Sequence, residues 1–236
     1  MSQENSIIAA RLFSLKKELG DCCRLVAVSK FHPSGSIREA YRAGQRIFGE
    51  NRAQELVAKY DELKDELKDV EWHFIGSLQS NKVKFLVPFV SLIQSVSSQK
   101  LLDEIEKQAA KIDRVVDILL EVHVAKEETK SGFSVNDVYQ VVKTFIESGL
   151  YRHIRLRGLM TMATNTDDEQ LIRHEFHSVS ELFYRIKRDF ALPDFDELSM
   201  GMSNDYPLAI AEGATLVRIG TSIFGEREYN VDSNKK

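Results

Sequence analysis

The sequence predicts an α/β protein, a single (β/α)8 TIM barrel with one additional helix at the N-terminus. Eight short apolar segments alternate along the 236 residues with longer amphipathic segments. Alternation of this kind builds a parallel sheet whose strands are joined by helices, and eight such units fit a chain of this length. The alternative, an open doubly wound sheet, typically carries a glycine-rich loop after its first strand. Here the first apolar segment ends in Ser-Lys-Phe-His-Pro, which favours the barrel.

The eight candidate strands are short runs of aliphatic and aromatic residues. They lie at 24–30, 46–51, 71–76, 91–96, 115–124, 154–162, 196–202 and 215–225. Apolar residues recur at helical spacing between them, which predicts helices at 36–44, 53–68, 98–112, 135–149 and 168–190. The same spacing predicts the N-terminal helix within 1–20. No linker interrupts the pattern, so we expect one domain over 1–236, with a polar tail at 229–236.

Composition and charge restrict the classes of partner. Hydrophobic residues make up 43% of the chain, enough for a sizeable core, and the formal net charge of −4 indicates no nucleic-acid partner. No apolar run approaches the ~18 residues of a membrane span, and the N-terminus does not resemble an export signal. Cys22 and Cys23 are adjacent and cannot form a C-x-x-C pair. We therefore expect a cytoplasmic protein that acts as a monomer.

The first candidate strand ends at Lys30. Because side chains alternate across a strand, Val26, Val28 and Lys30 share one face. The ordinary alternative is a lysine whose amine reaches solvent. Apolar surroundings, however, disfavour the charged ammonium form, and a neutral amine can form a Schiff base with an aldehyde. Active sites of such barrels lie at the carboxyl ends of the strands, so Lys30 is the leading candidate for covalent chemistry.

The last two strands are followed by segments suited to an anion. Arg218 interrupts the final apolar run, and Gly220 and Thr221 follow it. The glycine allows close approach of backbone N–H groups and the threonine adds a hydroxyl, at the position where these barrels commonly bind phosphate. After the seventh strand, Ser203 precedes a predicted helix at 206–213 whose first N–H groups could join the same site. Taken singly, these segments are equally explained by a glycine bend and a helix cap.

Together these features indicate one class of ligand. The first and eighth strands of a closed barrel are neighbours, so a Schiff-base lysine would lie beside the anion-binding segments. A phosphorylated aldehyde is the ligand that requires both. Asn51 and Glu50 end the second strand and could also reach it, whereas His73 is better explained as a hydrogen-bonded core histidine. The other histidines lack metal-site spacing, so we expect no metal.

Seven segments, in order along nearly the whole chain, resemble the YggS/PROSC-type pyridoxal phosphate homeostasis proteins. They are LVAVSK (25–30), FGENRAQE (48–55), WHFIGSLQSNK (72–82), KSGF (130–133), RGLMTM (157–162), LSMGMSND (198–205) and VRIGTSIFGER (217–227). The resemblance implies a barrel like the N-terminal domain of alanine racemase, with pyridoxal 5′-phosphate as cofactor. Lys30 would match the Schiff-base lysine and Arg218 the arginine facing the pyridine nitrogen. Residues matched to the ring and phosphate contacts are Asn51, Met200, Ser203, Gly220 and Thr221.

The resemblance also implies a cofactor-managing protein with no catalytic residues. An arginine at the pyridine nitrogen keeps it unprotonated and weakens the ring as an electron sink. Only about ten residues follow the last strand, so we expect no second domain of the kind that completes a racemase site. Such a protein would serve intracellular pyridoxal phosphate homeostasis and could supply pyridoxal phosphate-dependent apo-enzymes. A small racemase of the same fold is the alternative, and a phosphosugar aldolase with a Schiff-base lysine is a more distant one.

Overall fold

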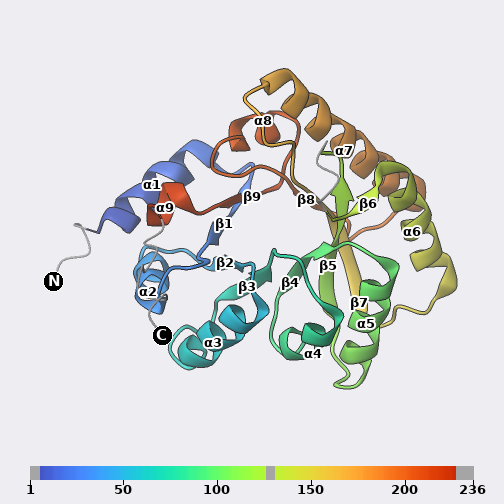
Figure 1. Cartoon of the computed structure of the whole chain (residues 1–236), viewed down its shortest axis with the longest axis horizontal. Helices are drawn as coiled ribbons and strands as arrows, with labels where there is room; N and C mark the ends of the chain where they lie inside the picture. The colour runs from blue at the N-terminus through green and yellow to red at the C-terminus, as the bar shows by residue number, and fades with distance from the viewer. Residues whose placement is uncertain (1–5, 126–130, 227–236) are drawn as a thin grey trace, which may run out of the picture.

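Eight parallel strands close into a barrel (Figure 1). The computed structural model describes residues 6–125 and 131–226. The barrel strands are β1 (Arg24–Val28), β2 (Ile47–Glu50), β3 (Glu71–Phe74), β4 (Leu92–Val96), β5 (Val116–His123), β7 (Ile154–Thr161), β8 (Glu197–Ser199) and β9 (Leu216–Ile219). Each pairs with the next in this order, and the ring closes where β9 pairs with β1. The predicted fold class is confirmed.

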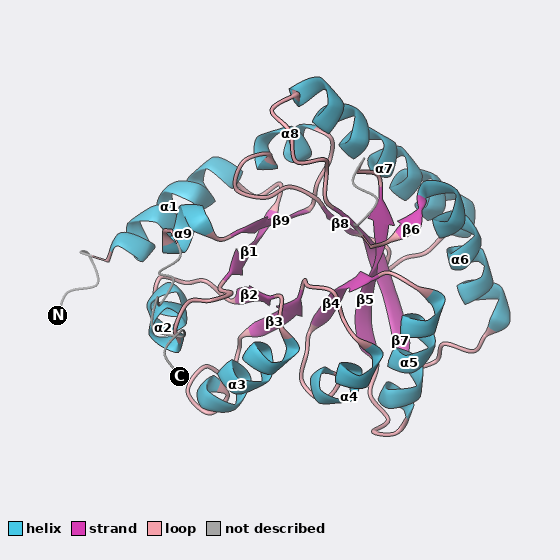
Figure 2. Cartoon of the chain, viewed as in Figure 1, coloured by secondary structure: helices cyan, strands magenta, loops and turns pink. Residues whose placement is uncertain are grey.

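Helices surround the strands on the outside of the ring (Figure 2). They are α1 (Ile7–Leu19), α2 (Ser34–Arg42), α3 (Ala53–Leu63), α4 (Val83–Leu86), α5 (Gln99–Ala110), α6 (Val135–Ser148), α7 (Glu169–Phe190), α8 (Tyr206–Ala211) and α9 (Thr221–Phe224), with a 3-10 turn at Ser80–Lys82. Their inward faces and the outward faces of the strands form one large buried cluster. None of the described helices has the length and apolarity to cross a membrane.

The structure differs from the sequence prediction at three places. The last strand ends at Ile219 rather than continuing to 225, because the chain turns at Gly220 into the short helix α9. A two-residue strand, β6 (Phe133–Ser134), pairs with the end of β5 beyond the part that pairs with β4. Between the third and fourth strands, where no helix was predicted, the chain forms the 3-10 turn and α4. The predicted polar tail at 229–236 lies outside the described residues.

The N-terminal helix α1 covers the side of the barrel next to β9 and β1. It packs beside α2 and α9 (Figure 1), and the Tyr206 hydroxyl of α8 donates to Glu18 of α1 at 2.6 Å. Helix α9 has only four residues and cannot cover this side alone. Buried residues of α1, among them Leu12 and Leu19, supply the missing apolar surface. The additional helix therefore completes the outer ring.

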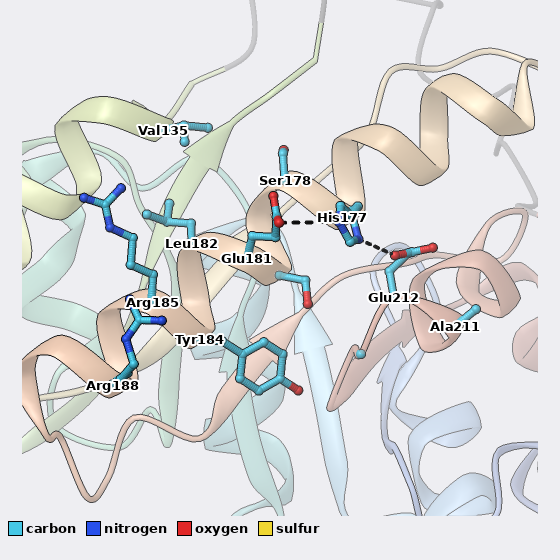
Figure 3. A pocket seen from close by; sticks show the side chains of 12 residues that line it. Val135, His177, Ser178, Glu181, Leu182, Tyr184, Arg185, Arg188, Ala211 and Glu212 are labelled. Carbon is cyan, nitrogen blue, oxygen red and sulfur yellow. Dashed lines mark hydrogen bonds and ion pairs between the residues drawn. The ribbon is translucent and has the colours of Figure 1, made fainter.

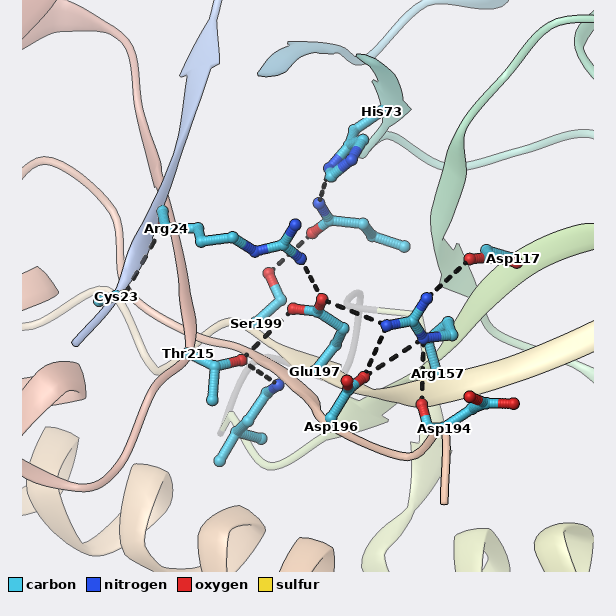
Figure 4. A network of polar contacts seen from close by, with 12 residues as sticks. Cys23, Arg24, His73, Asp117, Arg157, Asp194, Asp196, Glu197, Ser199 and Thr215 are labelled. Carbon is cyan, nitrogen blue, oxygen red and sulfur yellow. Dashed lines mark hydrogen bonds and ion pairs between the residues drawn. The ribbon is translucent and has the colours of Figure 1, made fainter. Parts of the chain in front are cut away.

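The barrel interior is apolar in the middle and ionic at the amino ends of the strands. The apolar residues form a separate cluster that contains Val26, Ile47, Leu92, Leu119, Met160 and Leu216. At the amino ends, Glu197 pairs with Arg24 and Arg157 pairs with Asp117 and Asp196 (Figure 4). These ion pairs close the end of the barrel opposite the mouth, so a ligand site is expected at the carboxyl ends of the strands.

Candidate functional site

The carboxyl ends of the strands bring the sequence-predicted residues to one mouth of the barrel. Lys30 follows β1 by two residues and is half-buried, while Asn51 directly follows β2. Ser203 lies in the turn between β8 and α8, and Thr221 begins α9 directly beyond β9. Because the strands are parallel, these residues share one rim although they are up to 191 positions apart in the sequence.

Asn51 is held by a close backbone approach and has an unpaired side-chain oxygen. A Cβ at Gly76 would lie 2.1 Å from the Asn51 carbonyl oxygen, so only glycine fits where β3 ends beside Asn51. The Asn51 Oδ1 atom is buried and has no hydrogen-bond partner among the described residues. An unpaired buried acceptor is costly, and a bound ligand with a donor group would satisfy it.

Glu50 does not reach the mouth, contrary to the sequence prediction. Its side chain is buried between β1, β2 and α3, where Oε1 accepts from the Ser29 hydroxyl at 2.6 Å and from the Lys59 ammonium at 2.7 Å. Alternation along β2 explains the difference, because Gly49 faces the barrel interior against Val26 and its neighbour must face outward. Burial raises the pKa of Glu50 to about 7.

Arg218 lies inside the barrel, almost completely buried, and heads a chain of polar groups. It donates to the Ser199 hydroxyl at 2.6 Å and to the Thr161 carbonyl oxygen at 2.8 Å. Ser199 donates to Gln94 Oε1 at 2.7 Å, and the Gln94 amide lies 2.9 Å from His73 Nδ1 (Figure 4). Burial lowers the pKa of Arg218 to about 10, so the guanidinium stays charged near neutral pH.

Gly220 and Thr221 lie where the end of β9 meets the end of β1. A Cβ at Gly220 would come within 2.9 Å of the Val28 carbonyl oxygen, so the glycine permits this approach. Thr221 is exposed and is the first residue of α9, and the leading N–H groups of a helix have no acceptor within it. Backbone and hydroxyl donors therefore lie close to the strand that leads into Lys30.

The loop after β8 leaves Ser203 partly exposed, whereas Met200 is buried. Ser203 is half-buried in the turn before α8, and the same loop is tied to β9 because the Arg218 N–H donates to the Gly201 carbonyl at 3.0 Å. Met200 is completely buried in the cluster shared with the helices. Its side chain faces away from the mouth, and its backbone N–H already donates to the Leu216 carbonyl oxygen at 3.1 Å.

Two further residues that can transfer protons, His73 and Tyr206, form hydrogen bonds away from the mouth. His73 is buried, accepts from Gln94, and has its pKa lowered by burial to about 3, as expected for a hydrogen-bonded core histidine. The hydroxyl of Tyr206 is bonded to Glu18 on the outer face, and burial raises its pKa to about 12. Neither residue offers a proton-transfer group at the mouth.

Sequence reasoning missed two residues on β5. Glu121 and His123 alternate with outward apolar residues and continue the inward face that contains Leu119. Burial raises the pKa of Glu121, which lies in the electrostatic field of Arg218. His123 Nδ1 is a buried nitrogen without a partner in the part of the chain that the structure describes. The signal was present as two polar residues at alternate positions near the carboxyl end of the strand, on the face that contains Leu119.

A separate groove of about 870 Å³ lies on the outside, between α7 and α8 (Figure 3). Its lining includes His177, Glu181, Arg185 and Glu212, and His177 pairs with both carboxylates. It contains none of the predicted site residues. Within the described ranges no cluster of histidine, cysteine and carboxylate side chains could hold a metal ion.

Comparison with known proteins identifies the family to which the chain belongs. The sequence matches the family described as alanine racemase, N-terminal domain, over residues 6–228. A pyridoxal phosphate homeostasis protein of Aquifex aeolicus is 44% identical over 211 residues, which cover 89% of each chain. The chain belongs to the pyridoxal phosphate homeostasis protein family. A member from Haemophilus influenzae is 38% identical over 212 residues, covering 90% of this chain and 88% of the relative.

Solved structures agree with this family. PipY of Synechococcus elongatus, without PLP, superposes with a TM-score of 0.87 at 39% identity, covering 92% of this chain and all of that one. PipY with PLP bound gives a TM-score of 0.84 at 38% identity over the same shares. An alanine racemase of Clostridium difficile has a TM-score of 0.71 but only 14% identity, over 95% of this chain and 57% of that one. That similarity concerns the fold alone.

Proposed function

We propose that this protein binds pyridoxal 5′-phosphate at the mouth of its barrel, with Lys30 as the covalent attachment. The observation that carries the proposal is the convergence of Lys30, Arg218 and the Gly220-Thr221 turn at adjacent strand ends. The family supports it, since PipY has been solved with PLP bound. No other pair of neighbouring strands in the described part of the barrel ends in a lysine and a glycine-threonine turn.

The residues at the mouth fit this cofactor. Asn51 Oδ1 and His123 Nδ1 are buried polar atoms left unpaired by the described protein groups, as expected where a polar ligand completes the bonding. Gly220 keeps the end of β9 free of a side chain that would collide with Val28. Ser203, Thr221 and the first N–H groups of α9 are donors suited to a phosphate.

Each group has a distinct task in this proposal. When bound, the cofactor supplies an aldehyde, with which a lysine amine condenses to form a carbon–nitrogen double bond and one water. Lys30 provides the amine. Arg218 offers only N–H donors, so a pyridine nitrogen facing it accepts a hydrogen bond and stays unprotonated. Ser199 and the carbonyl of Thr161 hold the guanidinium in place at 2.6 and 2.8 Å.

We further propose that the protein holds the cofactor for homeostasis and has no dedicated turnover. The curated relatives are named homeostasis proteins, and an arginine opposite the pyridine nitrogen disfavours carbanion chemistry. Delivery to pyridoxal phosphate-dependent apo-enzymes, a monomeric state, a cytoplasmic location and a single domain over 1–236 belong to the same proposal. The racemase alternative has support only from the shared fold.

Titration of the apo-protein with pyridoxal phosphate tests the proposal. We expect a new absorption band at longer wavelength than that of the free aldehyde, saturating at one equivalent. Lys30→Ala should abolish this band and leave the circular dichroism spectrum unchanged, because Lys30 lies beyond the end of β1 and outside the buried hydrophobic clusters. A wild-type protein without the band, or an unaltered band in Lys30→Ala, would contradict the proposal.

A further inference from the structure

Helix α3 carries a buried lysine on its inward face. Lys59 lies in line with Leu56 and Leu63, which belong to the core, and its side chain is only 8% exposed. Its ammonium lies 2.8 Å from the Ser29 carbonyl oxygen and 2.7 Å from Glu50 Oε1. It also lies 2.8 Å from Glu55 Oε1. All three ammonium donors are therefore used, as a buried lysine requires.

These contacts converge on the backbone of Lys30. The Ser29 carbonyl belongs to the peptide group that precedes Lys30, and Lys59 holds it. The Phe31 N–H belongs to the peptide group that follows Lys30, and it donates to Glu55 Oε1 at 2.7 Å. Side chains of α3 therefore hold both peptide groups of Lys30 by hydrogen bonds.

The chain direction after Lys30 needs this support. Phe31 has a φ of 67°, a left-handed conformation that is uncommon for a residue other than glycine. The bond from the Phe31 N–H to Glu55 offsets part of the cost of that conformation. Ser29 is also held through its side chain, which donates to Glu50 at 2.6 Å. The α3 groups therefore help to hold the strand end in this conformation.

We infer that Lys59 and Glu55 are positioning residues for Lys30, a conclusion that rests on the proposed role of Lys30 as the attachment site. Lysine has a long flexible side chain, so its amine reaches a fixed ligand atom often enough only if its backbone is fixed. Loss of either α3 group lets the segment 29–31 adopt other conformations. Covalent attachment then weakens, while the phosphate and ring contacts made by Arg218, Gly220 and Thr221 remain.

Two cofactor forms separate positioning from general damage. Pyridoxal phosphate can be attached through its aldehyde, whereas pyridoxamine phosphate carries an amine instead and binds only through its ring and phosphate. In Glu55→Ala we expect pyridoxal phosphate to bind about tenfold or more weakly, a loss of about 1.4 kcal/mol. Pyridoxamine phosphate should bind within about twofold of the wild type. Glu55→Gln keeps an oxygen acceptor for the Phe31 N–H and should restore most of the affinity.

The second variant removes Lys59 without leaving Glu50 as a buried charge that has no partner. Lys59→Met alone would leave Glu50 buried beside no cation, so it is combined with Glu50→Gln. The double variant should show the same selective loss for pyridoxal phosphate. Lys64→Met is the matched control, because Lys64 caps the end of α3 and its partner Asp61 is exposed. The control should bind both cofactor forms as the wild type does.

The outcomes are distinguishable. Equal loss of both cofactor forms in Glu55→Ala and in the double variant would mean a merely structural role and overturn the inference. Unchanged binding of both forms would overturn it as well. A wild-type protein that binds pyridoxamine phosphate but never forms the long-wavelength band would instead overturn the attachment at Lys30, and the inference with it.

Discussion

Arg218 donates a hydrogen bond to the Ser199 hydroxyl at 2.6 Å inside the barrel, and this bond connects the mouth to the centre of the interior. The Ser199 hydroxyl donates a hydrogen bond to Gln94 Oε1, and the Gln94 amide nitrogen donates to His73 Nδ1. The direction of every bond in this chain is fixed, because arginine and the Gln94 amide nitrogen can only donate, so His73 Nδ1 accepts. The orientation of the guanidinium is thus decided by residues that no ligand touches.

Replacing Gln94 tests this chain. Gln94→Leu leaves His73 Nδ1 and the Ser199 hydroxyl without their partner in a buried position. We expect a loss of about 1–3 kcal/mol in the free energy of unfolding, measured by urea titration. Gln99→Leu is the control, since Gln99 is exposed on α5 and should change stability by less than about 0.5 kcal/mol. Equal stability of the two variants would refute the role of the chain.

The phosphate contacts predict a graded effect on binding. Thr221→Ala removes a hydroxyl at the start of α9, and pyridoxal phosphate should bind about 1–3 kcal/mol more weakly, the range for a hydrogen bond to a charged group. Pyridoxal without the phosphate should bind far less well to the wild type and should be insensitive to Thr221→Ala. If pyridoxal and its phosphate bind the wild type equally, no phosphate site exists in this turn.

The buried carboxyl group of Glu50 predicts a pH dependence of stability. Burial raises its pKa from the ordinary 4.5 to about 7, against the opposing effect of Lys59, and its Oε2 has no partner among the described residues. The folded state therefore binds the proton more tightly than the unfolded state. Between pH 4.5 and about 7 this group makes the protein less stable as pH rises, by up to about 1.4 kcal/mol per pH unit.

A comparison with Glu50→Gln isolates that contribution. The free energy of unfolding of the wild type minus that of the variant should decrease as pH rises from 5 to about 7 and then level off. Glu55 and Lys59, the other charged groups in contact with this site, are present in both proteins. A difference that grows with pH would mean that Lys59 dominates and that the folded pKa of Glu50 lies below 4.5.

The barrel and most of its rim could be predicted from the sequence because both follow local rules. Periodicity identified all eight barrel strands and most of the helices between them, and alternation in β1 placed Lys30 on the face that contains Val26. The same rule, applied to β2, would have turned Glu50 outward, and applied to β5 would have found Glu121 and His123. Lys59 was also detectable, as a charged residue on the apolar stripe of a helix.

Other features could not be read from the sequence. The bonds from α3 to both sides of Lys30 depend on how the helix docks against β1 and β2, which no local pattern specifies. The burial of Met200 depends on which face of a three-residue strand turns outward. The helix at 221–224 was hidden because its residues continue the apolar run of the last strand.

The absence of turnover can be tested by proton exchange. We expect the loaded protein to exchange the α-hydrogen of L- and D-amino acids in heavy water far more slowly than a kcat of about 1 s⁻¹, which is ordinary for enzymes. Racemisation needs a base on each face of the α-carbon, and His73 and Tyr206 are bonded elsewhere. Exchange at an enzymatic rate would favour the racemase alternative, and its loss in His123→Gln would identify the second base.

The attachment of pyridoxal phosphate to Lys30 is tested most directly by chemical trapping. Borohydride reduces the bond between cofactor and lysine to a stable amine, and mass spectrometry of the digested protein then locates the modified residue. We predict a single labelled peptide, with the label on Lys30, and no label there in a protein reduced before the cofactor is added. Labelling of a different lysine in place of Lys30, such as Lys82 or Lys84 beyond β3, would contradict the account.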